Sequence, residues 1–107
     1  MSNLKADFVL EGRKLTVTLF GELDHHSAGE IMKEINVKID DELPRDCILD
    51  MHGVTFMDSS GIAVAIRTYR KMNLTGGRMW IENVQSQPMH IFDAAGVDRI
   101  IHITATV

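Results

Sequence analysis

The chain lacks several features that mark specialised classes of protein. Its single cysteine, Cys47, excludes an internal disulfide and is typical of a reducing compartment. No run of like charges occurs and the formal net charge is only −4, so nothing indicates a nucleic-acid or anionic-membrane surface. The apolar runs are too short to span a bilayer, and the first residues form no apolar signal region. These absences favour a soluble cytoplasmic protein.

Patterns that mark common enzymes and cofactor sites are also missing. Gly76-Gly77 has neither the Walker nor the dinucleotide-binding spacing. Neither Ser59 nor Ser60 has a glycine two positions before it, so the nucleophile elbow of many hydrolases is absent. Asp24-His25-His26 has no third ligand at a zinc-binding spacing. We therefore predict a protein that is not an enzyme and holds no cofactor or metal; a small serine hydrolase is the alternative from another class.

The bulk composition is that of an ordinary globular domain. The chain has 107 residues, of which 45% are hydrophobic and 24% charged. Folding at this length buries roughly 65% of the surface of the unfolded chain, which is enough for one hydrophobic core. We expect a single domain over residues 1–107.

The first half of the sequence predicts a β-hairpin followed by a helix. Alternating residues 5–10 and 15–20 form the two strands, joined by the turn Glu11-Gly12-Arg13. Gly21-Glu22-Leu23-Asp24 breaks the alternation and leads into a helix over residues 25–41, for which Asp24 and Ser27 are both possible N-caps. The apolar stripe of this helix consists of Ala28, Ile31, Met32, Ile35 and Ile39.

The second half predicts alternating strands and helices. A buried strand over residues 47–51, with Cys47 as a structural thiol, is followed by a connection over residues 52–57. The remaining elements are a helix over residues 60–73, a strand over 78–82, a helix over 87–95 capped by Ser86 with Gly96 just after it, and a strand over 100–103. The order ββαβαβαβ indicates an α/β fold: a small mixed sheet of four to five strands with about three helices on one or both faces.

The helix over residues 60–73 has two distinguishable faces. Projection at 100° per residue places an apolar set toward the core: Ile62, Ala65, Ile66, Tyr69 and Met72. The opposite face carries a ridge that consists of Val64, Arg67, Thr68 and Lys71. We expect this ridge to face solvent or a partner protein, with its basic residues toward acidic groups of that partner.

The segment Phe56-Met57-Asp58-Ser59-Ser60-Gly61 is the most informative part of the chain. It joins a strand to a helix start, where unpaired N–H groups and the positive end of the helix dipole are exposed. A serine hydroxyl there is accessible to another protein, and the position tolerates a phosphate dianion in the folded state. Helix capping by Ser59 or Ser60 is the alternative interpretation, and both roles are compatible.

Two motifs together resemble one protein family. Gly21-Glu22-Leu23-Asp24-His25-His26 and the segment over residues 56–61 are similar to the STAS family, specifically to the bacterial anti-sigma factor antagonists. The Gly76-Gly77 turn, Phe92-Asp93-Ala94-Ala95-Gly96 and the order of elements agree with this resemblance over nearly the whole chain. It implies the STAS fold. Family members commonly continue into a further helix after the last strand, which this sequence does not contain.

The resemblance implies a partner-switching protein of the sporulation type. In that family, the unphosphorylated antagonist binds an anti-sigma factor that is also a serine kinase, and a sigma factor is released. The kinase phosphorylates a serine that matches Ser59, after the aspartate that matches Asp58, and a metal-dependent phosphatase removes the phosphate. A STAS scaffold or regulatory module with no sigma factor is the alternative within the same fold.

The resemblance also indicates a partner-binding surface, because it places the turn at residues 24–25 beside the serine loop. The residues that we assign to this surface are Asp24, His25, Met57, Asp58, Ser59, Ser60, Ala63, Val64 and Arg67. Phosphorylation adds about −1.5 to −2 charges at neutral pH, so we expect it to act by repulsion and bulk at the interface. Little change in the fold is expected.

Overall fold

A computed structural model describes residues 3–106 and contains a five-stranded sheet in the order β1-β2-β3-β4-β5. The strands are β1 (Leu4–Glu11), β2 (Lys14–Leu23), β3 (Asp46–Met57), β4 (Arg78–Val84) and β5 (Ile103–Ala105). The helices are α1 (His25–Glu42), α2 (Ser60–Leu74) and α3 (Ser86–Ala95), followed by a 3₁₀ turn over Val97–Arg99. The predicted α/β class and element order are confirmed.

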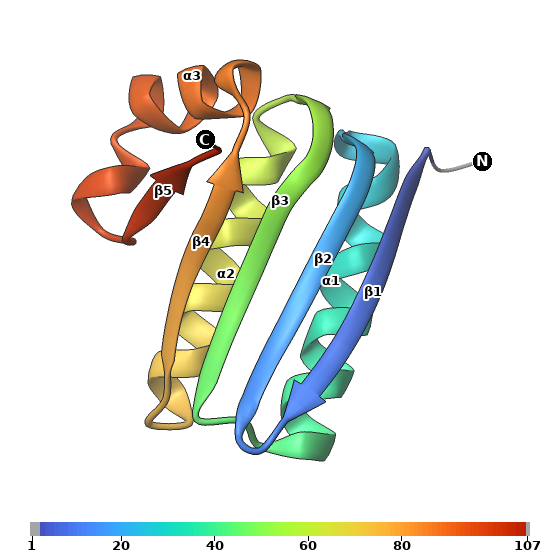
Figure 1. Cartoon of the computed structure of the whole chain (residues 1–107), viewed down its shortest axis with the longest axis vertical. Helices are drawn as coiled ribbons and strands as arrows, with labels where there is room; N and C mark the ends of the chain where they lie inside the picture. The colour runs from blue at the N-terminus through green and yellow to red at the C-terminus, as the bar shows by residue number, and fades with distance from the viewer. Residues whose placement is uncertain (1–2, 107) are drawn as a thin grey trace.

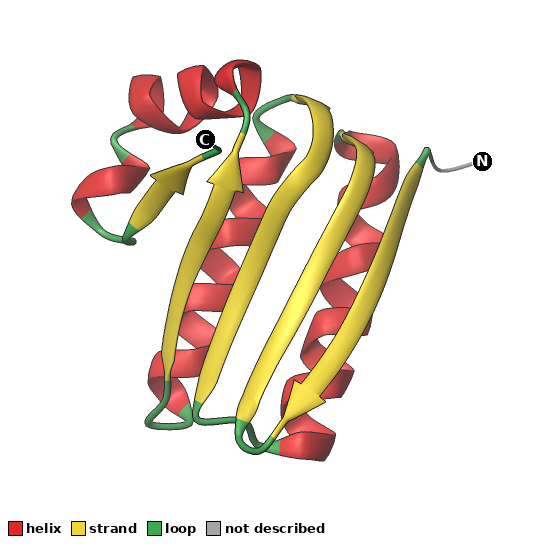
Figure 2. Ribbon diagram, in the orientation of Figure 1, coloured by secondary structure: helices red, strands yellow, loops and turns green. Residues whose placement is uncertain are grey.

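The sheet is mixed, as predicted. β1 is antiparallel to β2, whereas β2, β3, β4 and β5 run parallel to one another. Figure 1 shows α1 and α2 on the same face of the sheet, with α3 beyond the end at which β3 and β4 finish. Among residues 3–106, no helix covers the opposite face (Figure 2). The start of α1 and the start of α2 therefore lie at the same end of the sheet, where β2 and β3 end.

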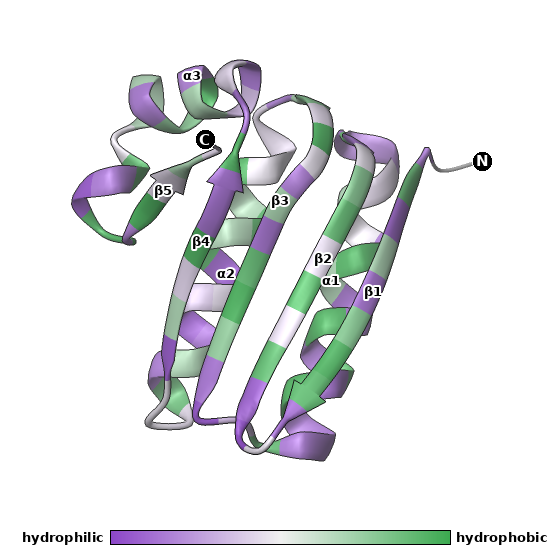
Figure 3. Cartoon of the chain, in the orientation of Figure 1, coloured by the Kyte–Doolittle hydropathy of each residue, from purple (hydrophilic) through white to green (hydrophobic). Residues whose placement is uncertain are grey.

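The hydrophobic core fills the space between the sheet and the α1–α2 layer. Along β2, Leu15, Val17 and Leu19 are buried and alternate with more exposed residues. Figure 3 shows the matching alternation of hydropathy along this strand. The predicted stripe of α1 packs against them, with Ala28 only half-buried. Cys47 is also in this core, and burial raises the pKa of its thiol to about 12, so the predicted structural role is confirmed.

β2 and β3 are both longer than predicted. Residues 21–23 continue β2, and residues 52–57, predicted as a connection, continue β3. The two segments pair with each other up to Leu23 opposite Met57, across two irregularities in register. Gly53 permits this close pairing, because a Cβ atom there would lie 2.4 Å from the ring of Phe20. Residues 52–57 were not predicted as a strand because they include a glycine and polar residues, and pairing with β2 stabilises them as one.

The orientation predicted for α2 is wrong for Val64 and Thr68, whereas Ala65 and Met72 are buried as predicted. Val64 and Thr68, predicted to face outward, are buried at 1% and 0% exposure. Thr68 can be buried because its hydroxyl donates to the main-chain oxygen of Val64 at 2.8 Å. The residues that face the core are Gly61, Val64, Ala65, Thr68 and Met72, while Ile62, Ile66 and Tyr69 are only partly buried. The prediction placed Thr68 on the outward face because threonine is polar, and this shifted the predicted core-facing side of the helix.

Two further corrections concern the C-terminal region. Gln85, not Ser86, occupies the N-cap position of α3, and Ser86 is the first helical residue. The last strand begins at Ile103, three residues later than predicted, because the 3₁₀ turn follows α3 and buries Ile101. Gly96 ends α3 in the left-handed conformation, at φ 72°, as expected for a glycine after a helix.

Candidate functional site at the start of the second helix

The site forms where two parallel strands end together. Leu23 of β2 lies opposite Met57 of β3, and the N–H of Asp58 donates to the main-chain oxygen of Leu23 at 3.2 Å. α1 begins at His25 and α2 at Ser60, each within three residues of these strand ends. The topology therefore brings the positive ends of two helix dipoles to one edge of the sheet.

The carboxylate of Asp58 connects the two helix starts. Its Oδ1 accepts a hydrogen bond from the N–H of Ser60 at 2.8 Å, and its Oδ2 accepts one from the N–H of His25 at 3.2 Å. The main-chain oxygen of Asp58 also accepts from Gly61 at 3.0 Å. Asp58 thus satisfies unpaired N–H groups of both α1 and α2, and it holds the loop before α2 against the start of α1.

Ser59 lies at the exposed end of this arrangement. Its backbone is already helical, at φ −62° and ψ −17°, and its side chain makes no capping hydrogen bond. Ser59 therefore occupies the N-cap position of α2 as predicted, but its side chain does not cap the helix; the Asp58 carboxylate accepts the hydrogen bond from the Ser60 N–H instead. The Ser59 side chain is exposed, which leaves its hydroxyl accessible at the N-terminus of α2.

Asp24 is the N-cap of α1, which decides between the two predicted candidates. Its carboxylate accepts from the N–H groups of His26 at 3.0 Å and Ser27 at 3.1 Å. The Ser27 hydroxyl oxygen in turn accepts from the N–H of Asp24 at 3.0 Å, so the two residues form a capping box. Desolvation raises the pKa of Asp24, but the hydrogen bonds from Ser27 and His26 outweigh it and lower the pKa overall.

The predicted partner-binding residues divide by exposure. Their exposed members are His25, Ser59, Ala63 and Arg67, and their half-buried members are Asp24, Asp58 and Ser60. Met57 and Val64 are buried, so the prediction that their side chains form part of the partner surface is wrong. Met57 instead packs beneath the first turn of α2, where a Cβ atom on Gly61 would lie 2.3 Å from it.

One exposed apolar side chain at the site was not predicted as a contact. Phe56 precedes Met57 on β3 and is 42% exposed. Because neighbouring strand residues point to opposite faces, Phe56 and Met57 cannot both be buried on the helix side. The prediction of residues 52–57 as a connection concealed this exposure, which follows from their being a strand.

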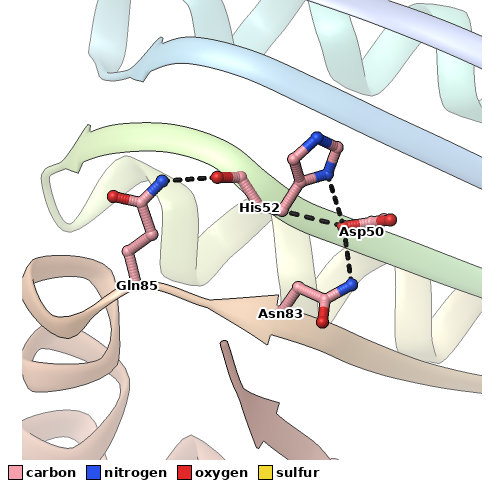
Figure 4. A network of polar contacts seen from close by, with 4 residues as sticks. All are labelled: Asp50, His52, Asn83 and Gln85. Atoms are coloured by element: carbon pink, nitrogen blue, oxygen red, sulfur yellow. Dashed lines mark hydrogen bonds and ion pairs between the residues drawn. The ribbon is translucent and has the colours of Figure 1, made fainter. Parts of the chain in front are cut away.

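Three amide side chains support the outer edge of β3 beyond its pairing with β4, which extends only from Asp46 to Asp50. Asn83 donates to the carboxylate of Asp50 at 3.2 Å, and Gln85 donates to the main-chain oxygen of His52 (Figure 4). The Gln87 amide accepts from the N–H of Met57 at 2.8 Å and donates to its oxygen at 3.0 Å. Gln85 and Gln87 thus bond to main-chain groups of β3 in place of a neighbouring strand, whereas Asn83 bonds to the Asp50 side chain. None of these contacts was predicted from the sequence.

Asp50 and His52 form a polar pair on the face of the sheet opposite the helices. His52 Nδ1 lies 3.0 Å from the Asp50 carboxylate, and the edge of the Phe20 ring packs against the imidazole at 5.3 Å between centroids. Burial alone would raise the pKa of Asp50. Hydrogen bonds from the His52 main chain, the Asn83 amide and the His52 ring lower it overall.

The arrangement does not resemble a hydrolase centre. The imidazole of His52 is paired with Asp50 on β3, while Ser59 lies at the start of α2, and no hydrogen bond joins the two residues in the described part of the chain. Residues 3–106 contain no group of three or more histidine, cysteine or acidic side chains suited to a metal ion. No helix within those residues is long and apolar enough to cross a membrane.

The sheet order, the single helical layer and the serine at the start of α2 define a STAS domain. The STAS domain model matches residues 6–107, and the chain belongs to this family. It is 30% identical over 101 residues to the anti-sigma F factor antagonist of Paenibacillus polymyxa, covering 94% of this chain and 86% of the relative. It is 28% identical to the anti-sigma-B factor antagonist of Bacillus subtilis, covering 96% and 93%.

Solved structures agree with these relatives. The unphosphorylated anti-sigma factor antagonist SpoIIAA superposes with a TM-score of 0.81 at 25% identity, covering 92% of this chain and 87% of that one. SpoIIAA from Bacillus in its phosphorylated form superposes with a TM-score of 0.72. The names of these relatives describe regulatory antagonists and not enzymes, in agreement with the prediction.

Proposed function

We propose that this chain is an anti-sigma factor antagonist whose binding is controlled by phosphorylation of Ser59. Unmodified, it binds an anti-sigma factor that has serine kinase activity, and a sigma factor is thereby released. The observation that carries the proposal is that the exposed Ser59 hydroxyl makes no capping hydrogen bond, in a chain 30% identical to an anti-sigma F factor antagonist. The phosphorylated and unphosphorylated forms of SpoIIAA, a relative with the same fold, support the same cycle.

The physical basis of the switch is local charge. A phosphate on Ser59 would add about −1.5 to −2 charges beside the Asp58 carboxylate. The α2 dipole stabilises an exposed anion by roughly 0.3–1 kcal/mol, so the fold tolerates the group. At an interface the same dianion is desolvated and repelled, and a thousandfold loss of affinity needs only about 4 kcal/mol. Phosphorylation therefore controls binding while the domain stays folded.

The contact surface follows from exposure around Ser59. His25 contributes from α1, while Ala63 and Arg67 contribute from the solvent-facing side of α2. Phe56 adds an exposed apolar side chain from the end of β3. A partner that contacts this surface covers the serine hydroxyl, and an acidic group on the partner would pair with Arg67.

Reversal of the switch needs a second protein. A metal-dependent serine phosphatase would remove the phosphate and restore the binding form. Both reactions act on a regulator of transcription, so we place this cycle in the cytoplasm. This STAS domain itself contributes no catalytic group: it is the substrate of the kinase and of the phosphatase.

A phosphorylation assay tests the proposal. The purified chain is incubated with ATP and the anti-sigma factor kinase of the same genome, and the product is analysed by intact mass and peptide mapping. We expect one phosphate, located on Ser59, and none on Ser59→Ala. Ser60→Ala is the matched control and should be phosphorylated normally. A phosphate on another residue would refute the site, and absence of both binding and phosphorylation would favour a STAS module that acts without an anti-sigma factor.

A further inference from the structure

Over residues 5–11, the outer edge of β1 has no neighbouring strand in the described sheet. β1 pairs only with β2, through a register without irregularities that ends at Glu11 opposite Lys14. Along each strand of an antiparallel pair, residues whose main-chain N–H and C=O groups bond to the other strand alternate with residues whose groups point away from it. Because Gly12 and Arg13 form a two-residue turn that closes with Glu11 and Lys14, the outward main-chain groups belong to alternate residues. These include Ala6, Phe8 and Leu10.

The two faces of β1 differ in character. Ala6, Phe8 and Leu10 lie opposite the β2 residues buried in the core, so they face the α1 side. Lys5, Asp7, Val9 and Glu11 lie on the face without helices, and that set is charged except for Val9. Beside the edge, a groove of about 340 Å³ lies between β1 and α1, lined by Phe8, Lys33, Glu34, Val37 and Lys38.

We propose that the β1 edge pairs with β1 of a second copy of this chain, in an antiparallel register centred on Phe8. In this register Ala6 lies opposite Leu10 of the second copy, so apolar residues meet on the helix side. Lys5 lies opposite Glu11 of the second copy, so opposite charges meet on the other face. Both contacts occur twice because of the two-fold symmetry. Apolar residues therefore meet on the helix side, and opposite charges meet at both ends of the other face, where Asp7 lies opposite Val9 between them.

The neighbouring registers are less favourable. A register centred on Asp7 places two Asp7 carboxylates directly opposite each other. A register centred on Val9 places Asp7 opposite Glu11, which is also a like-charge pair. A register centred on Ala6 pairs Lys5 with Asp7 but joins only residues 4–8, whereas the one centred on Phe8 joins residues 5–11. The longer pairing with matched charges is the one that the sequence of β1 favours.

The exposure of the edge agrees with this occupant. Leu10 is 40% exposed on β1, and Val37 is 57% exposed on the neighbouring flank of α1. A second strand added at the edge would cover Leu10 and extend the groove wall over Val37. β2 separates β1 from β3, so the Ser59 site remains outside the interface and each copy keeps its own site. The inference does not depend on the proposed function.

Sedimentation of the full chain with charge-reversed variants tests the pairing. We expect a concentration-dependent dimer, and a dissociation constant at least about tenfold weaker for Lys5→Glu, which places two glutamates opposite each other. The double variant Lys5→Glu/Glu11→Lys should restore the dimer. Arg99→Glu is the matched control: it makes the same change of net charge at an exposed position outside the sheet, and its dimer should be unchanged.

A backbone variant provides an independent test. Ala6→Pro removes an N–H that points away from β2, so the monomer should keep its circular dichroism spectrum while the dimer is lost. The proposal is overturned if the wild-type chain stays monomeric at all accessible concentrations, which would leave the edge to a strand of another protein. It is equally overturned if every variant dimerises as the wild type does. Rescue of Lys5→Glu by Asp7→Lys instead of Glu11→Lys would refute the register centred on Phe8.

Discussion

The side-chain amide of Gln87 pairs with the main chain of Met57 through hydrogen bonds of 2.8 and 3.0 Å, in the manner of a neighbouring strand. Met57 directly precedes Asp58 and Ser59, and β4 no longer pairs with β3 at that point. α3 therefore fixes the position of the loop that carries Ser59. The two hydrogen bonds connect the last helix of the described chain to the candidate site.

Replacement of Gln87 by methionine tests this connection. Gln87→Met keeps the length of the side chain but removes both hydrogen bonds, which should lower the free energy of unfolding by about 1–3 kcal/mol. Hydrogen exchange at Asp58 and Ser59 should become faster, because the loop loses its support on one side. Ser86→Ala, at an exposed neighbouring position, is the control and should change neither quantity. Unaltered exchange at residues 57–60 in Gln87→Met would show that α3 does not support the loop.

Removal of the Asp58 carboxylate should destabilise two helix starts together. Asp58→Ala leaves the N–H groups of His25 and Ser60 without their acceptor, at a cost of about 1–3 kcal/mol in urea unfolding. Asp58→Asn keeps one side-chain oxygen as an acceptor and should lower the free energy of unfolding by less. If Asp58→Ala were as stable as the wild type, the dual capping role would be refuted.

On α2, Val64 is buried in the core and Arg67 is exposed, so substitutions at the two positions should affect stability and partner binding separately. Val64→Ala should lower the free energy of unfolding by about 2 kcal/mol, while the folded variant keeps its affinity for the kinase partner. Arg67→Glu should leave stability within about 0.5 kcal/mol of the wild type but weaken partner binding. Chemical unfolding and titration calorimetry on both variants check the pair. If Val64→Ala weakened partner binding and Arg67→Glu lowered stability instead, Val64 would be part of the partner surface, as first predicted.

Acid unfolding should report on Asp50. Its pKa is lowered in the folded protein from the ordinary value of 3.8, so the unfolded chain takes up the proton first as the pH falls. The stabilising contribution is therefore complete above the ordinary pKa, and it is lost as the pH falls through the folded-state pKa. Asp50→Asn should flatten the loss of stability below about pH 5, whereas Asp98→Asn, at an exposed position, should not. Parallel curves for the wild type and Asp50→Asn would contradict this assignment.

The sequence predicted the order of elements well, because local signals determine it. Alternation in residues 15–20, the apolar stripe of α1 and Gly96 are each recognisable without tertiary contacts. The aspartate and serines at residues 58–60 mark a helix start in the same way. The likeness of two motifs to one family then supplied the function that residue patterns alone leave open.

The errors arose where tertiary contacts decide the structure. The second half of β3 contains His52, Gly53 and Thr55, and it is a strand only because β2 pairs with it. Thr68 faces the core because its hydroxyl bonds within α2, which a polarity scale does not reveal. The hydrogen bonds from Gln85 and Gln87 join positions that are 33 and 30 residues apart in the sequence, and no spacing rule predicts them.

Calorimetric titration of the kinase partner measures how negative charge on the Ser59 hydroxyl changes binding. The chain is prepared unmodified and phosphorylated at Ser59, and both forms are checked for the same melting temperature. We predict tight binding by the unmodified form and affinity lower by about a thousandfold, or about 4 kcal/mol, for the phosphorylated form. Equal affinity of the two folded forms would contradict the account.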